Sequence, residues 1–145
     1  MPTAADVTEI EALAARYGEA WNSQDLEAIV DFHAEDGLFH LHAGSDPVQG
    51  REAIHASFAA VIAQWPDIHF EEQRLIAAED GWVLQSTMSG SLAQPLELEG
   101  SVIAQPGASI AVDALDLIEV QDGLITAKHT YLDSATLLRQ LGVVS

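Results

Sequence analysis

Apolar and polar residues alternate most regularly between Ile110 and Val120, in the stretch IAVDALDLIEV. Apolar and β-branched residues dominate this stretch and turn-prone residues flank it, so the pattern predicts a β-strand. Because successive side chains of a strand point to opposite faces, the even positions share one face. All of them are apolar except Asp116, which stands in the middle. We therefore expect this face in the core, where Asp116 must be paired, hydrogen-bonded or protonated, since burying a bare charge is costly.

The first half of the chain has helical periodicity instead. Apolar residues recur at spacings of three and four, which predicts helices whose apolar side faces the core. Tyr17 lies in the apolar stripe of the first helix, so its hydroxyl needs a polar partner in the core. The expected helices are Ala4–Trp21, Asp25–His33 and Arg51–Trp65, with a strand at Leu38–His42 before the third.

Strands predominate after Pro66. The expected ranges are Ile68–Ala78, Trp82–Leu92, Leu98–Ala104, Ile110–Val120 and Leu124–Asp133, with a short closing helix at Ala135–Leu141. Three helices followed by a run of strands predict one α+β domain over residues 1–145, with the helices on one face of a curved antiparallel sheet. Small or polar residues such as Ser86 and Gly90 on the expected inner face favour incomplete filling, and hence an apolar ligand cavity.

The composition narrows the possible partners. The formal net charge is −18, and Lys and Arg together number only 5, which argues against nucleic acid and anionic membranes. There is no cysteine, so disulfides and thiolate metal sites are excluded. The N-terminal residues lack a signal-peptide pattern, and no apolar stretch approaches the length of a membrane span. We therefore expect a cytoplasmic protein whose partners are neither nucleic acid nor membranes.

Several short motifs occur in an order and spacing that resembles a known family. They are Ala15-Arg16-Tyr17, Ala20-Trp21-Asn22, Phe32-His33-Ala34-Glu35-Asp36-Gly37, Val48-Gln49-Gly50-Arg51-Glu52-Ala53-Ile54, Val112-Asp113-Ala114-Leu115-Asp116, Asp122-Gly123-Leu124-Ile125 and Tyr131-Leu132-Asp133. With them the chain resembles, over nearly its whole length, the SnoaL-like polyketide cyclase and ketosteroid isomerase branch of the nuclear transport factor 2 superfamily. The resemblance implies a cone-shaped sheet around the helices, a deep pocket for a small hydrophobic ligand, and a homodimer through the convex sheet face. It also implies cofactor-free proton transfer on a carbonyl compound, although this fold hosts many unrelated functions.

The resemblance also assigns roles to residues. Tyr17 stands where ketosteroid isomerases have the tyrosine of their oxyanion hole, and Asp116 where they have the protonated aspartic acid beside it. Leu41 stands at the position of the isomerases' general base, and Thr130 at that of an aspartate in the last strand of SnoaL-like cyclases. Neither side chain moves protons. A shift of the alignment by one residue puts His40 or His42 at the base position, and we expect the base to be His40 or a bound water. Two hypotheses stay open: an isomerase or cyclase, and a non-catalytic ligand-binding or dimerisation module.

Other candidate residues also have two interpretations. Asp116 and Tyr17 either bind a ligand oxygen or satisfy each other in the core. His40 and His42 share a strand face and could bind a metal, but no third ligand is evident, so we expect no metal and no cofactor. Lys128, on the expected inner face of the last strand, either meets an anionic ligand or extends to water. The residues expected to line the ligand site, with core packing as the alternative for each, are Trp21, Phe32, Phe39, Leu41, Phe58, Ile62, Trp82, Met88, Thr130 and Leu132.

The remaining histidines carry no predicted role. We expect His33, His55 and His69 on solvated surfaces of helices or strands. His129 and Tyr131 fall on the face of the last strand opposite Thr130. A third activity that suits this fold, epoxide hydrolysis, needs two carboxylates and an arginine, whereas the pattern places only Asp116 inward.

Overall fold

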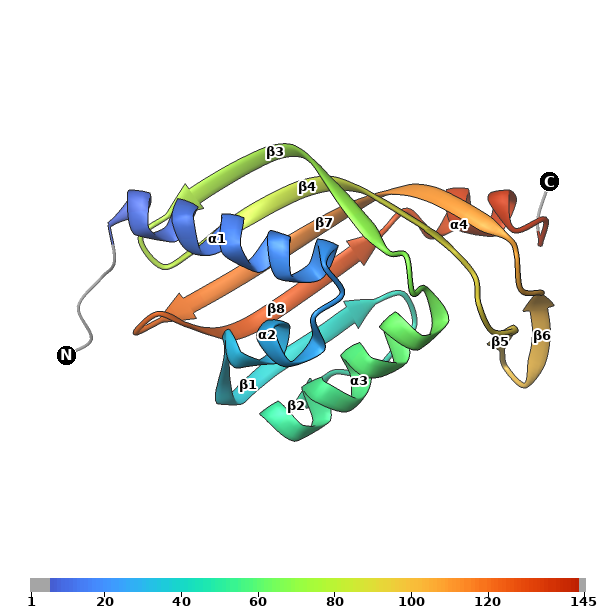
Figure 1. Cartoon of the computed structure of the whole chain (residues 1–145), viewed down its shortest axis with the longest axis horizontal. Coiled ribbons are helices and arrows are strands. Elements are labelled where there is room, and N and C mark those ends of the chain that lie inside the picture. The colour runs from blue at the N-terminus through green and yellow to red at the C-terminus, as the bar shows by residue number, and fades with distance from the viewer. Residues whose placement is uncertain (1–5, 144–145) are drawn as a thin grey trace.

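The computed structural model describes residues 6–143, which form an α+β fold (Figure 1). In chain order its elements are α1 (Val7–Asn22), α2 (Leu26–Asp31), β1 (His33–His42), β2 (Val48–Gln49), α3 (Arg51–Gln64), β3 (His69–Ala78), β4 (Gly81–Ser91), β5 (Leu96–Leu98), β6 (Ser101–Ala104), β7 (Ser109–Gln121), β8 (Leu124–Leu132) and α4 (Ser134–Gln140). The predicted fold class is confirmed. Among residues 6–143 no helix is both long and apolar enough to cross a membrane.

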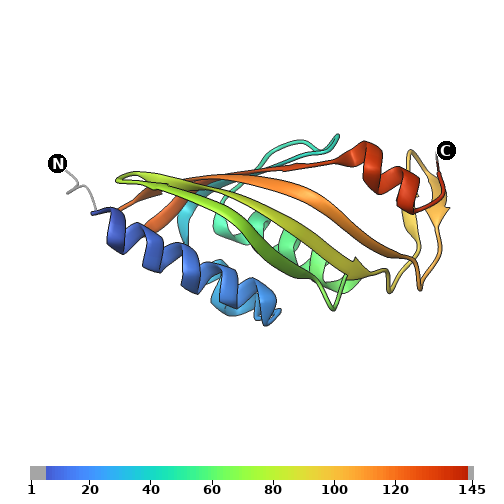
Figure 2. The same ribbon diagram turned by 90° about the horizontal axis from the view of Figure 1, so that it is seen from above.

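In this part of the chain six strands form the main sheet, in the order β2-β1-β8-β7-β4-β3. Neighbouring strands run antiparallel except β1 and β8, which pair in parallel. The prediction of a wholly antiparallel sheet is wrong at this pair, because β1 and β8 are far apart in the sequence and no hairpin turn fixes their relative direction. Seen from above, the sheet curves over α1, α2 and α3, and α4 lies near one end (Figure 2).

The strand β7 has the alternation that its sequence predicts. Within Ile110–Val120 every even residue is buried and every odd residue is exposed. The buried side chains share one core with α1 and α3, whose large apolar residues such as Ile54 and Phe58 are almost fully buried. Asp116 is 6% exposed, so its carboxylate does lie within the apolar face. The prediction of a core face with one carboxylate in it is confirmed.

The strand β1 begins at His33, well before the predicted start at Leu38. Its pairing with β8 shifts register between these two residues, where the chain follows an irregular path. Gly37 suits this path, because an added Cβ would lie 3.1 Å from the Ala34 oxygen and 3.2 Å from the Ile125 oxygen. The irregularity carries the side chain of His33 into the core, where it is fully buried. The predicted surface position of His33 is therefore wrong.

The stretch predicted as one strand at Leu98–Ala104 belongs to a small hairpin of β5 and β6, separate from the main sheet. Its turn is Glu99-Gly100, where both residues have positive φ (51° and 82°), a conformation that glycine adopts without strain. The other predicted elements agree with the structure to within a few residues at each end. The predicted start of the first helix at Ala4 lies outside the described residues. Within them α1 begins at Val7, and the side chain of Asp6 caps it by accepting a hydrogen bond of 3.0 Å from the Glu9 amide.

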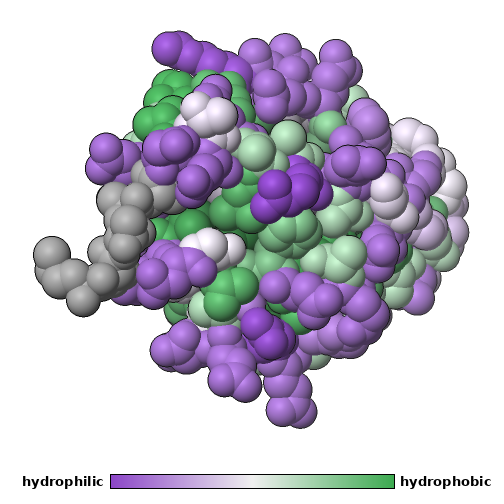
Figure 3. All heavy atoms as spheres, turned by 60° about the vertical axis from the view of Figure 1, so that its left-hand side comes forward, coloured by the Kyte–Doolittle hydropathy of each residue, from purple (hydrophilic) through white to green (hydrophobic). Residues whose placement is uncertain are grey.

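The odd residues of β7 leave apolar side chains on the convex face of the sheet. Leu115 and Leu117 are 41% and 43% exposed, and Tyr131 of the neighbouring β8 is 44% exposed. At the end of the molecule seen in Figure 3, hydrophilic side chains surround a smaller area of hydrophobic ones. A homodimer through the convex face stays a prediction.

Candidate active site

A cavity of about 210 Å³ lies between the concave face of the sheet and the helices α1 and α3. Leu96 of β5 and Leu137 of α4 also contribute to its wall. The wall is mostly apolar, and its polar side chains are Gln64, Asp116, Lys128 and Thr130. Among these wall residues only Asp116 and Lys128 are ionisable, so they are the candidates for chemistry in the cavity.

Most residues predicted to bind a ligand lie in this wall. They are Trp21, Phe39, Leu41, Phe58, Met88, Thr130 and Leu132. Three others do not line it. Phe32 and Trp82 pack edge-on against the Tyr17 ring, with centroids 5.5 Å and 6.0 Å away, and Ile62 packs against the core from α3. Helical and strand periodicity predicted that these three face the core but could not separate a cavity wall from the packing behind it.

Asp116 is held by the neighbouring strand. The register places it opposite Thr130 of β8, whose hydroxyl donates a hydrogen bond of 2.5 Å to Asp116 Oδ1. The two side chains are 6% and 9% exposed, yet both reach the cavity. Within residues 6–143 the carboxylate has this single hydrogen-bond donor, so its second oxygen remains for a molecule in the cavity.

Tyr17 does not pair with Asp116. Its hydroxyl lies 2.9 Å from His33 Nε2 and accepts a hydrogen bond of 3.1 Å from Lys128 Nζ. A lysine ammonium can only donate, so the Tyr17 hydroxyl gives its own proton to His33 Nε2, and His33 Nδ1 carries the ring proton. The expected direct pair is therefore not formed between these described residues, and Tyr17 lies outside the cavity wall. Positions on an apolar face do not fix which polar groups meet across the core.

Lys128, Tyr17 and His33 form a chain of hydrogen-bonded side chains, and burial strongly affects the protonation state of each. It raises the pKa of Tyr17 against the opposing effect of Lys128, so the hydroxyl stays neutral near pH 7. Burial lowers the pKa of His33 to about 3, and the charges of Lys128 and Arg51 act in the same direction, so the ring is neutral. Burial also disfavours the charged form of Lys128, whereas the negative charge of Asp116 and the hydrogen bond to the Tyr17 hydroxyl favour it, and the pKa of Lys128 is raised.

Lys128 is enclosed by aromatic rings rather than by water. Its Nζ lies 4.8 Å from the ring centroid of Trp21, 4.9 Å from that of Tyr17 and 5.3 Å from that of Phe58. Such cation–π contacts partly replace the hydration that the ammonium loses. The residue is 5% exposed, so the interpretation in which it extends to water is wrong. No local sequence signal marks this site, because the rings come from helices far from β8 along the chain.

Asp116 and Lys128 face the same cavity without forming an ion pair. Lys128 is opposite Ile118, two residues along β7 from Asp116, so their Cα atoms are diagonal neighbours roughly 7–8 Å apart. Within residues 6–143 the one contact at ion-pair distance joins exposed groups of His55 and Glu27, 2.8 Å apart. The carboxylate and the ammonium can therefore reach different atoms of one molecule, which suits removal of a proton at one atom and stabilisation of negative charge at another.

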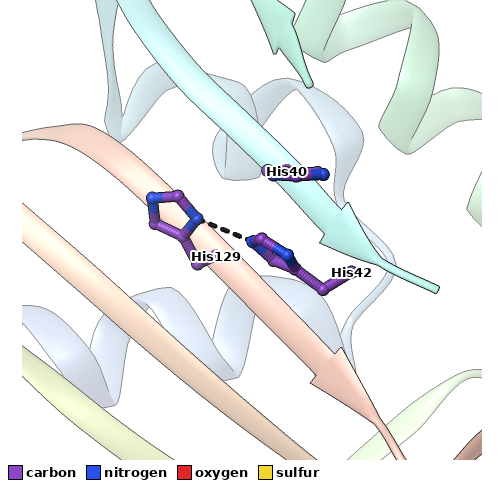
Figure 4. Close-up of side chains that lie close together, drawn as sticks. All are labelled: His40, His42 and His129. Carbon is purple, nitrogen blue, oxygen red and sulfur yellow. Dashed lines mark hydrogen bonds between the residues drawn. The ribbon is translucent and has the colours of Figure 1, made fainter. Parts of the chain in front are cut away.

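His40 points away from the cavity. Its neighbours Phe39 and Leu41 line the cavity, so His40 faces the convex side of β1. It cannot act as a base on a molecule in the cavity, and that predicted role is wrong. On the convex face it lies beside His42 and His129 (Figure 4). Partial burial and these neighbouring imidazoles lower the pKa of His42.

Comparison with known proteins identifies the family. Residues 14–128 match the family model of the SnoaL-like domain. IdmH of Streptomyces antibioticus, a proposed polyketide cyclase, is 28% identical with a TM-score of 0.72, over 92% of this chain and 98% of IdmH. A proposed polyketide cyclase of Xanthomonas campestris pv. campestris is 20% identical with a TM-score of 0.82, over 93% of this chain and 98% of that protein. AclR of Streptomyces galilaeus, a proposed hydroxylase, is 21% identical with a TM-score of 0.79, over 97% of this chain and 100% of AclR.

The last two likenesses show the shared fold alone, whereas the family match extends over most of the described chain. The chain belongs to the SnoaL-like domain family.

Proposed function

We propose that the chain binds a small, largely hydrophobic carbonyl compound in the cavity and moves a proton on it without a cofactor, in an isomerisation or a cyclisation. One observation carries the proposal: Asp116 and Lys128 line the same apolar cavity and form no ion pair with each other among the described residues. The apolar wall supports a largely hydrophobic ligand, and the few convergent polar groups support one that carries oxygen.

Lys128 binds the carbonyl oxygen in this proposal. When a proton leaves the carbon next to a carbonyl, negative charge develops on the oxygen, and a cation held ready in a water-poor site stabilises it. Tyr17 accepts one hydrogen bond from Lys128 and so positions the ammonium. The remaining ammonium protons are available to the ligand. In this proposal Lys128 stabilises the oxyanion, the role that the resemblance gives to Tyr17 and Asp116.

Asp116 moves the proton. Its carboxylate is fixed through one oxygen by Thr130, and the other oxygen takes the proton from the carbon next to the carbonyl. The C–H electron pair then forms the enolate bound to Lys128. Return of the same proton to a different carbon completes an isomerisation. Attack of the enolate carbon on a second carbonyl of the ligand closes a ring, and the proton on Asp116 then neutralises the new alkoxide.

The solved neighbours support this class of reaction in part. IdmH and the Xanthomonas protein are proposed polyketide cyclases, and cyclisation of such compounds is carbonyl chemistry. AclR is a proposed hydroxylase, so proteins of this fold differ in their reactions. The choice of proton transfer therefore rests on Asp116 and Lys128 rather than on the neighbours.

A non-catalytic binding module of the same fold is the second candidate. Leu41 favours it, because the position that resembles the general base of the isomerases is an apolar part of the cavity wall. In that case Asp116 and Lys128 would hold polar atoms of the ligand and no proton would move.

Hydrogen–deuterium exchange at the α-carbon of small cyclic ketones separates the two candidates, because it needs proton removal but no complete reaction. In D2O the wild-type protein is expected to accelerate the exchange, followed by 1H NMR. Asp116→Asn is expected to slow it by about 10²–10⁴-fold, the usual contribution of a general base. Asp113→Asn is the matched control, because Asp113 lies on the same strand but is exposed on the convex face.

Binding of each ketone is measured in parallel by broadening of its NMR lines. A ketone that binds without exchange in the wild-type protein would favour the binding module. Exchange that persists in a folded Asp116→Asn variant would exclude Asp116 as the base.

A further inference from the structure

Three imidazoles meet on the convex face of the sheet. His40 and His42 alternate with Leu41 along β1, and the parallel pairing places His129 of β8 opposite His40. One nitrogen from each ring lies within 4.8 Å of one from each of the others. Figure 4 shows the rings gathered together, with His42 directed at His129. The strands β1 and β8 separate this cluster from the cavity, so it is a site of its own.

Neighbouring groups fix the orientation of two of these rings. His40 Nε2 lies 3.0 Å from the Ser45 carbonyl oxygen, to which it donates, so Nδ1 of this ring keeps its lone pair. The His42 ring stacks on Tyr131, with centroids 4.1 Å apart and an angle of 8° between the planes. Metal-ligating histidines generally donate their other ring N–H to a carbonyl or carboxylate, which is the arrangement of His40.

The spacing of the nitrogens suits one shared ion. His42 Nε2 and His129 Nδ1 lie 2.9 Å apart. Two nitrogens that bind the same transition-metal ion at about 2.0–2.1 Å are roughly 2.9–3.4 Å apart for angles from 90° to the tetrahedral value. These two ligand atoms are therefore already at a suitable separation. The His40 nitrogen lies within 4.8 Å of both, so the His40 side chain would have to move closer to share the same ion.

We propose that His40, His42 and His129 bind a divalent first-row transition-metal ion such as Zn²⁺. Imidazole suits these ions, and three protein ligands leave the remaining positions to water. The three side chains are only partly buried, so an ion reaches them from solvent. The net charge of −18 raises the local concentration of cations around the protein. The proposal is independent of the function of the cavity.

Calorimetric titration of the full chain, without a histidine tag, with Zn²⁺ at pH 7.5 tests the site. We expect one ion per chain. Loss of a residue that only hydrogen-bonds to a metal ligand typically lowers metal affinity by about 10–100-fold. His129 and His40 are proposed as direct ligands, so His129→Gln and His40→Gln should each lower the affinity by more than about 100-fold. His69→Gln is the matched control, because His69 is an exposed histidine on β3, and it should leave the affinity unchanged. Lowering the pH to 5 should weaken binding, because protons compete for the imidazole nitrogens.

Imidazole 15N NMR identifies the ligands independently of the variants. Zn²⁺ should shift the resonances of His40, His42 and His129 together at a stoichiometry of one, while His69 stays unchanged. The absence of saturable binding would overturn the proposal and leave a cluster that only shares a proton between His42 and His129. Equal losses of affinity in folded His69→Gln and His129→Gln would place the ion elsewhere and overturn it too.

Discussion

The two faces of β8 hold polar groups under opposite conditions. Lys128, on the concave face, is 5% exposed and is fixed by Tyr17 and aromatic rings. His129 follows it directly in the sequence, yet lies partly exposed on the convex face beside two other imidazoles. A step of one residue thus changes the surroundings from a buried site in the cavity wall to an accessible cluster of imidazoles. Strand alternation lets one small sheet carry two kinds of chemistry with little interference between them.

The same contrast between buried and accessible surroundings is found among the histidines. His33 is fully buried and its pKa is lowered to about 3, so it remains neutral and accepts a hydrogen bond from Tyr17. His40 is only partly buried, and its ring donates to the backbone of a nearby loop. Residue type alone therefore says little about role, and burial decides which chemistry an imidazole can perform.

The largest expected difference between the faces is in stability. Phe58→Ala removes a ring that is 1% exposed and packs on the cavity side, and it should cost about 3–5 kcal/mol of the free energy of unfolding. Leu117→Ala on the convex face should cost less than about 1 kcal/mol, because the side chain is 43% exposed. Urea denaturation measures both. Similar losses would contradict the assignment of the core to the concave side.

The pH dependence of stability tests the buried histidine. The pKa of His33 is about 3 in the fold and near its ordinary value of 6.5 in the unfolded chain, so the unfolded chain binds the proton first as the pH falls. The contribution of neutral His33 is complete above pH 6.5 and is lost as the pH falls toward 3. Between these values the wild type should lose up to about 1.4 kcal/mol per pH unit more than His33→Gln.

Urea unfolding at several pH values from 7 to 4 measures this slope, and His69→Gln, an exposed histidine variant, should keep the wild-type slope. Parallel stability curves for wild type and His33→Gln would mean that His33 does not control the acid response.

Loss of the hydrogen bond from Thr130 to Asp116 should lower the free energy of unfolding by a smaller amount. Thr130→Val keeps the shape of the side chain but removes the donor to a buried carboxylate, which should cost about 1.5–3 kcal/mol. Thr126→Val on the same strand removes a longer hydrogen bond of 3.2 Å to the Glu119 carbonyl at a more exposed position, and it should cost less. Thermal unfolding compares the two variants. Equal costs would show that Thr130 does not hold Asp116 in place.

The sequence predicted much of the fold but less of the candidate site. Alternation along β7 correctly predicted that Asp116 is buried, and this prediction depends on local pattern alone. The enclosure of Lys128 depends on rings from two distant helices, and the meeting of His129 with His40 depends on a parallel pairing between distant strands. Such long-range contacts leave no periodic signal in the chain.

The smallest expected effect on stability comes from the convex face. Leu117→Lys should change the free energy of unfolding by no more than about 0.5 kcal/mol, because the side chain is exposed. If the predicted homodimer forms through this face, the same substitution should shift sedimentation toward the monomer, because it places a charge in an apolar contact. An unchanged assembly state would exclude Leu117 from the contact.

Lys128 carries the proposed function, as a buried cation that would stabilise an oxyanion in the cavity. Titration with a phenol whose absorbance distinguishes its ionised and neutral forms tests it most directly, at a pH just below the phenol's own pKa. We expect the wild type to bind the ionised form, Lys128→Met to lose this binding, and Tyr17→Phe to weaken it less while keeping the fold. Binding of the neutral form, or binding that is indifferent to both substitutions, would exclude this role of Lys128.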